Sequence, residues 1–289
     1  MSRALHPQYR AVVATYLSNL PDVRLEEVSF DATGATDVDQ LTRRLNDETM
    51  CALVGYPNFF GVIEDLAPIK AACERGGTQL ISVTTEPLSL GLLKPPGEFG
   101  VDIAVGEGQS LGVPMSLGGP AFGFFACQKK LVRNIQGRLV GETVDSEGRR
   151  GFVLTLATRE QHIRREKATS NICTSQTLCV LGATVYLSLL GKSGLRRMAE
   201  INLARAHAAK AQLAEQAKLE AVFSGPFFNE FVLRRKNLAQ AFSRCAEQKI
   251  IPGIRLDNWY PELADCLLVC ATEMNEREEI DRLVRTVAG

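Results

Sequence analysis

The sequence lacks an excess of charge of either sign, because its 289 residues include 33 lysines and arginines and 33 acidic residues. A chain without net charge has no general attraction for nucleic acid or for an anionic membrane surface. The sequence also lacks the apolar region of a signal peptide near its start, and we find no uninterrupted apolar run of about 18 residues. We therefore expect a cytoplasmic protein that binds neither nucleic acid nor a membrane.

Closely spaced metal ligands are missing as well. The 8 cysteines include no C-x-x-C pair, and the 3 histidines do not lie at zinc-binding distances from them in the sequence. We predict no metal site. The cysteines fit the reduced, mostly buried thiols of a cytoplasmic protein.

Hydrophobic residues make up 45% of the chain, which is enough for a substantial core. Apolar strands alternate with amphipathic helices in the first half, and this alternation predicts a parallel sheet covered by helices on both faces. We expect strands at 23–30, 51–55, 78–84, 101–105, 122–127 and 152–157, and helices at 6–20, 37–46, 64–75 and 129–135.

The stretch 101–126, VDIAVGEGQSLGVPMSLGGPAFGFFA, indicates a strand, a glycine-rich turn and a second strand, with no charged side chain after Glu107. Glycines allow a close backbone approach, as occurs where a ligand or another chain lies against the main chain. The alternative is a glycine-rich turn without a ligand. The polar segment 137–151 fits a surface loop.

Two further segments carry candidate site residues. GYPNFFGVIED, at 55–65, places Phe59 and Phe60 in a loop at the expected carboxyl end of a strand, where ligands bind in open α/β sheets. Packing against the sheet is the alternative for these rings. TREQHIRREKATSNICTSQ, at 158–176, is basic, but it lacks the interleaved aromatic residues of a nucleic-acid site, so a solvated helix face is favoured.

The second half of the chain has a different texture. An almost uncharged helix at 174–190 fits a core or interface helix, and a long alanine-rich helix follows it. Strands at 219–223, 228–235 and 264–271 and helices at 238–248 and 275–287 then predict a small α+β domain. We expect a large α/β domain at 1–172, and connecting helices with a small C-terminal domain at 173–289.

GQSLG, YPNFFGVIED and REKATSNICTSQ together resemble the glycine decarboxylase P-protein of the glycine cleavage system, in its N-terminal subunit, called subunit 1. The resemblance implies the aspartate aminotransferase-like fold type I of pyridoxal-phosphate (PLP) dependent transferases. The PLP-bearing half of that family has a lysine on the turn after a sheet strand, and this position falls on Gln109. A glutamine amide cannot form an imine. The partner of the pyridinium nitrogen falls on Thr84 or Thr85, and we expect Glu86 to be an exposed turn residue.

The resemblance implies a subunit of glycine dehydrogenase (aminomethyl-transferring, decarboxylating), an oxidoreductase of glycine catabolism that is inactive alone. PLP would be carried by P-protein subunit 2 in a heterodimer, glycine would be the substrate, and the aminomethyl group would pass to the lipoyl arm of the H-protein. This chain would bind no cofactor of its own. Arg165, Lys167, Thr169 and Asn171 are carried over as candidate contacts with the partner's site or interface.

Three points stay open. Subunit 1 of this family is longer, so we expect an N-terminal truncation that omits the first strand and a phosphate-side helix, unless another polypeptide supplies them. A non-catalytic scaffold or regulatory partner of the same fold is an alternative function. An independent PLP aminotransferase or desulfurase-like enzyme would have to use Lys94 or Lys129.

Overall fold

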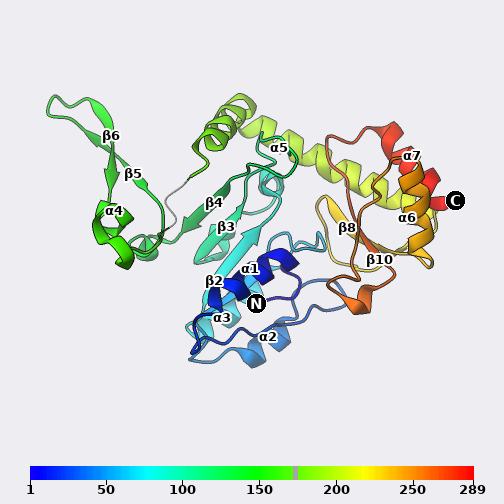
Figure 1. The fold of residues 1–289 in the computed structure, drawn as a ribbon, viewed down its shortest axis with the longest axis horizontal. Coiled ribbons are helices and arrows are strands. Elements are labelled where there is room, and N and C mark those ends of the chain that lie inside the picture. The colour runs from blue at the N-terminus through cyan, green and yellow to red at the C-terminus, as the bar shows by residue number, and fades with distance from the viewer. Residues whose placement is uncertain (172–174) are drawn as a thin grey trace.

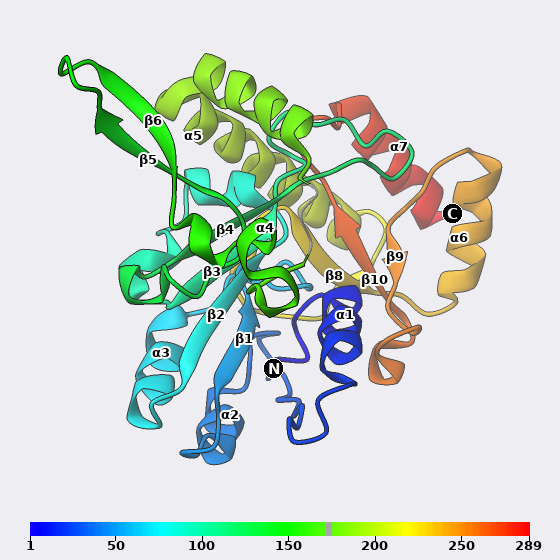
Figure 2. The same ribbon diagram turned by 60° about the vertical axis from the view of Figure 1, so that its left-hand side comes forward.

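The computed structural model describes residues 1–171 and 175–289. Its first sheet has the strand order β1-β2-β3-β4 (Figures 1 and 2). β1 (Cys51–Gly55), β2 (Gln79–Thr84) and β3 (Ile103–Glu107) are parallel, and β4 (Gly123–Cys127) is antiparallel to β3. The predicted α/β class is confirmed, but the sheet is mixed: three of its strands are parallel, as predicted, and β4 is antiparallel.

Helices α2 (Val38–Arg44) and α3 (Leu66–Arg75) begin where aspartates cap them. The Asp37 carboxylate accepts a hydrogen bond from the Gln40 amide, and the Asp65 carboxylate accepts one from the Ala67 amide. Leu66 and Ile69 of α3 are buried against the sheet. The apolar periodicity and the acidic caps therefore placed both helices correctly.

Two expectations near the start of the chain need correction. Helix α1 (Pro7–Leu17) forms, but Val12 and Tyr16 of its apolar face are 51% and 68% exposed. The strand expected at 23–30 is wrong, because only Val28 and Phe30 form single bridges, with Ser2 and Thr36 respectively. A strand needs a neighbour along its length, and residues 23–27 have none in the sheet.

A β-hairpin stands away from the rest of the molecule (Figure 1). Strands β5 (Leu139–Val144) and β6 (Arg150–Thr155) pair only with each other and form a two-stranded sheet of their own. The prediction of a surface loop at 137–151 is therefore wrong for its first half, because residues 139–144 form strand β5 of the hairpin. α4 (Gln161–Arg164) follows, and it is much shorter than a long solvated helix.

Helix α5 (Thr177–Glu215) joins the two halves of the chain. It is kinked at Gly191, whose φ of 60° and ψ of −174° are not helical, so the two helices expected here are present on either side of that glycine. Within the described residues, α5 is the one helix long and apolar enough to cross a membrane by length and composition, and 6% of its apolar window is buried. A single such helix is weak evidence for a membrane span.

The C-terminal sheet has the order β7-β8-β10-β9 and is antiparallel. β8 (Glu230–Arg234) and β10 (Cys266–Cys270) are its central strands, with β7 (Glu220–Ala221) and β9 (Ile254–Arg255) at the edges. α6 (Leu238–Glu247) and α7 (Arg277–Ala288) lie side by side over it (Figures 1 and 2). Most of this α+β arrangement was expected, whereas β9 was missed.

An aromatic cluster connects the first sheet with the C-terminal half. Phe60 lies with its ring centroid 4.8 Å from that of Phe223 and 5.1 Å from that of Tyr260. Val62 forms a backbone bridge with Phe227 beside it. The division of the chain at 172/173 stays a prediction. Short 3₁₀ helices complete the chain: Pro87–Gly91, Pro96–Phe99, Lys129–Leu131, Ala157–Arg159, Arg165–Lys167 and Pro261–Leu263.

Candidate functional site

The sequence predicted that Gln109 lies on a turn directly after a strand, and this turn follows β3. Glu107 ends β3, and its carboxylate accepts hydrogen bonds from the Gly108 amide at 3.0 Å and the Gln109 amide at 3.2 Å. The Gln109 side chain donates to the Pro114 carbonyl at 3.4 Å. Gln109 therefore does lie on the turn at the carboxyl end of β3, and its amide nitrogen is not the nucleophilic amine that an imine requires.

Several glycines of this turn face side chains of the same chain. A Cβ added to Gly108 would lie 2.3 Å from the Phe122 ring, and one added to Gly112 would lie 2.6 Å from Tyr186. These two glycines allow α5 and the start of β4 to pack closely against the turn. Gly118 has a φ of 112° and open space around its Cα. The close approach predicted for this stretch is therefore partly explained by packing within the chain.

Glu86 connects three segments at the same edge of the sheet. Its carboxylate accepts hydrogen bonds from the Ser110 hydroxyl at 2.7 Å, the Leu88 amide at 3.0 Å and the Asn229 side chain at 3.4 Å. Burial raises the pKa of Glu86, and these hydrogen bonds oppose that effect. The expected exposed turn residue is therefore wrong, because Glu86 is half-buried between the turns after β2 and β3 and the start of β8.

Two more carboxylates lie near Glu86. Asn202 of α5 donates to the Glu273 carboxylate at 2.6 Å and accepts a hydrogen bond from Asn229 at 3.4 Å. Burial raises the pKa of Glu230 to about 7, with a further contribution from the charge of Glu86. The sequence does not predict this cluster, because its members are far apart along the chain. They come from the turn after β2, from α5, from the start of β8 and from the segment after β10.

The family resemblance found in the sequence implies PLP, so the groups at this edge can be compared with what that cofactor needs. PLP requires an amine for its imine and donors or cations for its phosphate. Among the described side chains, the edge offers the Gln109 amide, the Ser110 hydroxyl, which already donates to Glu86, and the carboxylates of Glu86 and Glu107. Carboxylates repel a phosphate at close range. The residues present do not fit the cofactor.

The two lysines considered as alternatives lie elsewhere. The Lys94 ammonium lies 4.5 Å from the centre of the Phe99 ring, a cation–π contact. Lys129 follows β4, whose register pairs Gly123 with Glu107 at the carboxyl edge and Cys127 with Ile103 at the opposite edge. Lys129 is therefore at the far end of the sheet from Gln109.

The YPNFFG segment is a packed corner. The Asn58 side chain accepts hydrogen bonds from the Phe60 and Val62 amides, and it donates to the Glu64 carboxylate at 2.9 Å. Phe59 and Phe60 are 5% and 0% exposed. Thr36 also donates to Glu64, and burial raises the pKa of that carboxyl to about 6. The packing interpretation of the two phenylalanines is supported over a ligand-contact role.

The four interface candidates all lie on one exposed stretch. Arg165, Lys167, Thr169 and Asn171 are exposed to solvent, and in the described part of the chain their side chains form no hydrogen bond or ion pair. The same segment, 158–176, also contains Arg159, which is buried. From the sequence, a solvated helix face was favoured for the whole segment. That expectation is wrong for Arg159. Residues 172–174 of the motif lie outside the described residues.

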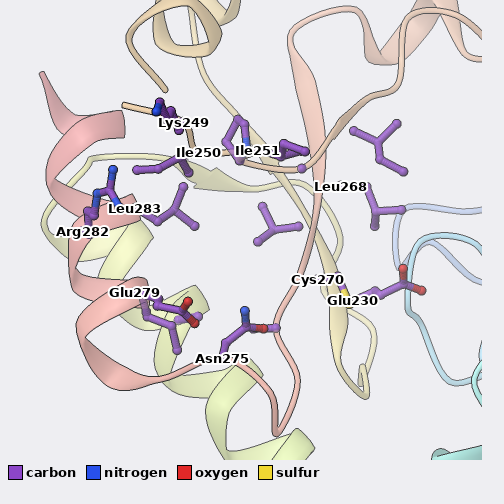
Figure 3. A pocket seen from close by; sticks show the side chains of 17 residues that line it. Glu230, Lys249, Ile250, Ile251, Leu268, Cys270, Asn275, Glu279, Arg282 and Leu283 are labelled. Atoms are coloured by element: carbon purple, nitrogen blue, oxygen red, sulfur yellow. The ribbon is translucent and has the colours of Figure 1, made fainter. Parts of the chain in front are cut away.

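A separate pocket of about 410 Å³ lies in the C-terminal half, between α7, β10 and the segment before β9 (Figure 3). Glu230 and Cys270 lie at one end of it, and Lys249 and Arg282 lie toward the other. Its remaining lining is mainly apolar. Among the described residues, none of the predicted site residues lines this pocket.

The fold defines a protein of the PLP-dependent transferase fold type I class, and the turn after β3 carries an amide side chain, that of Gln109. Structures with low identity show the fold: a NifS-like protein (13% identity, TM-score 0.69) and a cysteine desulfurase from Escherichia coli (16% identity, TM-score 0.72), each covering 99% of this chain. The model of the glycine cleavage system P-protein family matches residues 1–287. The chain belongs to this family.

Named relatives agree with the family model. The chain is 49% identical over 285 residues to a probable glycine dehydrogenase (decarboxylating) subunit 1 from Geobacillus thermodenitrificans, a match that covers 98% of the chain and 63% of the relative. It is 49% identical to the protein with the same name from Anaeromyxobacter dehalogenans, covering 100% of the chain and 64% of the relative. A crystal structure of glycine decarboxylase (P-protein) in inhibitor-bound form has 41% identity and a TM-score of 0.90, covering 99% of the chain and 64% of that protein. The chain thus spans less than two thirds of these relatives' length.

Proposed function

We propose that this protein acts as subunit 1 of glycine dehydrogenase (decarboxylating) in the glycine cleavage system, together with a second subunit that carries PLP. The observation that carries the proposal is the position of Gln109. It occupies the turn after β3 in a chain whose family and fold belong to PLP enzymes, yet its side chain is an amide held by the Pro114 carbonyl. The chemistry that needs an amine must then come from another chain.

The division of labour follows from the residues at this edge. PLP bound to the second subunit would supply the electron sink that glycine decarboxylation needs, and the lipoyl arm of the H-protein would accept the aminomethyl group. The hydrogen bonds of Glu86 to Ser110 and Asn229 hold the edge of this chain in one shape. A rigid edge of this kind is suited to lining one side of a site on a neighbouring subunit.

The interface candidates support contact with that neighbour. Arg165, Lys167, Thr169 and Asn171 present two cations and two hydrogen-bonding side chains on an exposed stretch. Cations and small polar donors are suited to an anionic group, and phosphate is the anionic part of PLP. We assign these four residues to the surface that faces the second subunit.

An exchange assay tests the proposed function. The second subunit, the lipoylated H-protein and labelled bicarbonate are incubated with glycine, with and without this chain. We expect label to enter glycine well above the second-subunit background when the chain is added, and no exchange with the chain alone. If the chain adds nothing while it still binds the second subunit, the non-catalytic scaffold becomes the better description.

We also propose a cytoplasmic location and a heterodimer. Cysteines 51, 73, 127, 179, 245, 266 and 270 are all free thiols, which suits a reducing compartment. Fractionation of the source cells and sedimentation of the mixed subunits would test these two points.

A further inference from the structure

The β5–β6 hairpin presents an apolar face to solvent. Its register pairs Val140 with Leu154 and Val144 with Arg150, and Phe152 lies between them on β6. Because side chains alternate between the faces of a strand, Val140, Val144, Phe152 and Leu154 share one face. They are 63%, 64%, 62% and 59% exposed, respectively. The same face also carries Glu142, which is opposite Phe152, and Arg150, whose guanidinium lies 5.5 Å from the centre of the Phe152 ring. Four exposed apolar side chains therefore gather on a face that also holds one acidic and one basic residue.

The base of the hairpin is fixed by one buried side chain. The Arg159 guanidinium donates to the carbonyls of Ile135, Gly137 and Leu156, with distances of 2.9 Å to Gly137 and 3.2 Å to Leu156. Ile135 and Gly137 precede β5, and Leu156 follows β6. One planar side chain with several donors therefore holds both ends of the hairpin together. Arg159 is 8% exposed although it belongs to a mostly exposed segment.

A two-stranded hairpin with an exposed apolar face is marginally stable in water by itself. Within the described residues, neither strand pairs with any other strand, and the hairpin points away from both sheets (Figure 1). A fixed base with an uncovered apolar face is the arrangement expected of an arm that is completed by another polypeptide.

The chain also indicates which polypeptide covers the arm. The hairpin leads through Arg159 into the exposed stretch that holds Arg165 and Lys167, and then into α5, where Leu178 and Leu189 are each 82% exposed. The surface assigned to the second subunit therefore lies between two segments with exposed apolar side chains in the order of the chain. The relatives' own name, subunit 1, implies a partner subunit that is a different chain.

We infer that the β5–β6 hairpin is a docking arm whose apolar face, Val140, Val144, Phe152 and Leu154, packs against the PLP-bearing second subunit, with Arg159 fixing the direction of the arm. The inference rests on the proposed function for the identity of the partner. Residues 129–167 contain ten lysines and arginines and five acidic residues, so the arm has a basic surround in a chain without net charge. If the second subunit presents acidic groups to this surround, docking weakens as the salt concentration rises.

The test measures the dissociation constant between the full chain and the purified second subunit, at low and high salt, together with the exchange activity of each mixture. The arm variant is Phe152→Ser/Leu154→Ser. The matched control is Ile251→Ser/Ile254→Ser, two isoleucines that are 91% and 47% exposed on the C-terminal half. A third variant, Arg159→Lys, keeps the charge but loses the planar set of donors. Circular dichroism checks that each variant is folded.

We expect the arm variant to bind the second subunit at least about tenfold more weakly, and Arg159→Lys to weaken binding in the same direction. The control should bind within about twofold of the unaltered chain, and excess second subunit should restore exchange for the arm variant. Unchanged affinity of the folded arm variant overturns the inference, as does a homodimer of this chain alone that the arm variant dissociates. If the unaltered chain fails to bind or activate the second subunit, the proposed function itself is wrong. This result is obtained with the unaltered proteins, before any variant is made, so it can be told apart from a failure of the docking inference.

Discussion

The Ser110 hydroxyl donates a hydrogen bond of 2.7 Å to the carboxylate of Glu86. This bond joins the turn after β3 to the turn after β2, and Asn229 brings the start of β8 to the same carboxylate. Hydrogen bonds to one carboxylate thus connect three segments at the carboxyl edge of the first sheet.

Replacing Glu86 by alanine should destabilise the protein. The Ser110 hydroxyl, the Leu88 amide and the buried Asn229 side chain would each lose an acceptor. Leaving buried donors unpaired costs about 1–3 kcal/mol in the free energy of unfolding. Urea denaturation measures this loss, with the exposed Glu98→Ala as the control. A variant as stable as the unaltered protein would show that Glu86 does not hold this edge.

Glu230→Gln should change the pH dependence of stability. Burial raises the pKa of Glu230 to about 7, and Glu86 adds to the effect, so the folded state binds a proton that the unfolded state releases near its ordinary pKa. The stabilising contribution of the protonated form is complete below about pH 4.5 and is lost as the pH rises through about 7. Glutamine mimics the protonated form. The variant should therefore exceed the unaltered protein in stability at about pH 8 by about 1–3 kcal/mol, with little difference at about pH 4. Urea denaturation at both pH values is the measurement, and an equal difference at both would contradict it.

The pH dependence of stability has the opposite sign at Asp102. Burial favours its neutral form, but hydrogen bonds from Lys130 at 2.8 Å and Lys70 at 2.7 Å prevail and lower its pKa to about 2. The stability that this carboxylate provides is present above its ordinary pKa of 3.8 and is lost as the pH falls through about 2. Asp102→Asn should cost about 2 kcal/mol at neutral pH and progressively less between about pH 4 and pH 2. Thermal unfolding as a function of pH measures this, and a loss that persists undiminished at about pH 2 would count against it.

Phe60→Ala should remove about 3–5 kcal/mol from the free energy of unfolding, because its fully buried ring packs against Phe223 and Tyr260. Tyr16→Ala, at an exposed aromatic residue, should change stability by about 0.5 kcal/mol or less. Chemical denaturation of both variants is the check. A Phe60 variant that keeps its stability but loses exchange activity would favour ligand contact over packing.

Gln109→Lys should not turn the isolated chain into a PLP protein. The new amine would lie beside the carboxylate of Glu107, at an edge that also holds Glu86, and the described residues there do not fit a phosphate. We expect no absorbance band of a bound imine at equimolar PLP, with the unaltered chain as the control. A stoichiometric band that borohydride fixes at residue 109 would show that the site needs only the amine.

Much of the first sheet could be predicted because its information is local. β1, β2 and α3 each combine an apolar run with a turn or an aspartate cap that ends or begins it. The hairpin was missed in part because β5 contains polar residues and exposes its apolar ones, so it lacks the buried pattern of a core strand. The strand expected at 23–30 failed for the converse reason, since its pattern has only single-residue partners.

The candidate site, too, could be predicted from the sequence only in part. The position of Gln109 on a turn could be predicted because the glycine-rich segment directly follows a clear strand. The resemblance to the family then aligned this residue with the lysine of the PLP-bearing half. The burial of Glu86 could not be anticipated, since the Asn229 that contacts it comes from 143 residues later in the chain. Arg159 was hidden in a basic run, because only the folded hairpin brings the Ile135, Gly137 and Leu156 carbonyls around its guanidinium.

The central claim, that the amine and the cofactor belong to the second subunit, has a direct test. The active mixture of both subunits is treated with borohydride, digested, and searched by mass spectrometry for the pyridoxyl group. We predict that the group is found on a lysine of the second subunit and on no residue of this chain. A pyridoxyl adduct on any lysine of this chain, formed in proportion to activity, would contradict the claim.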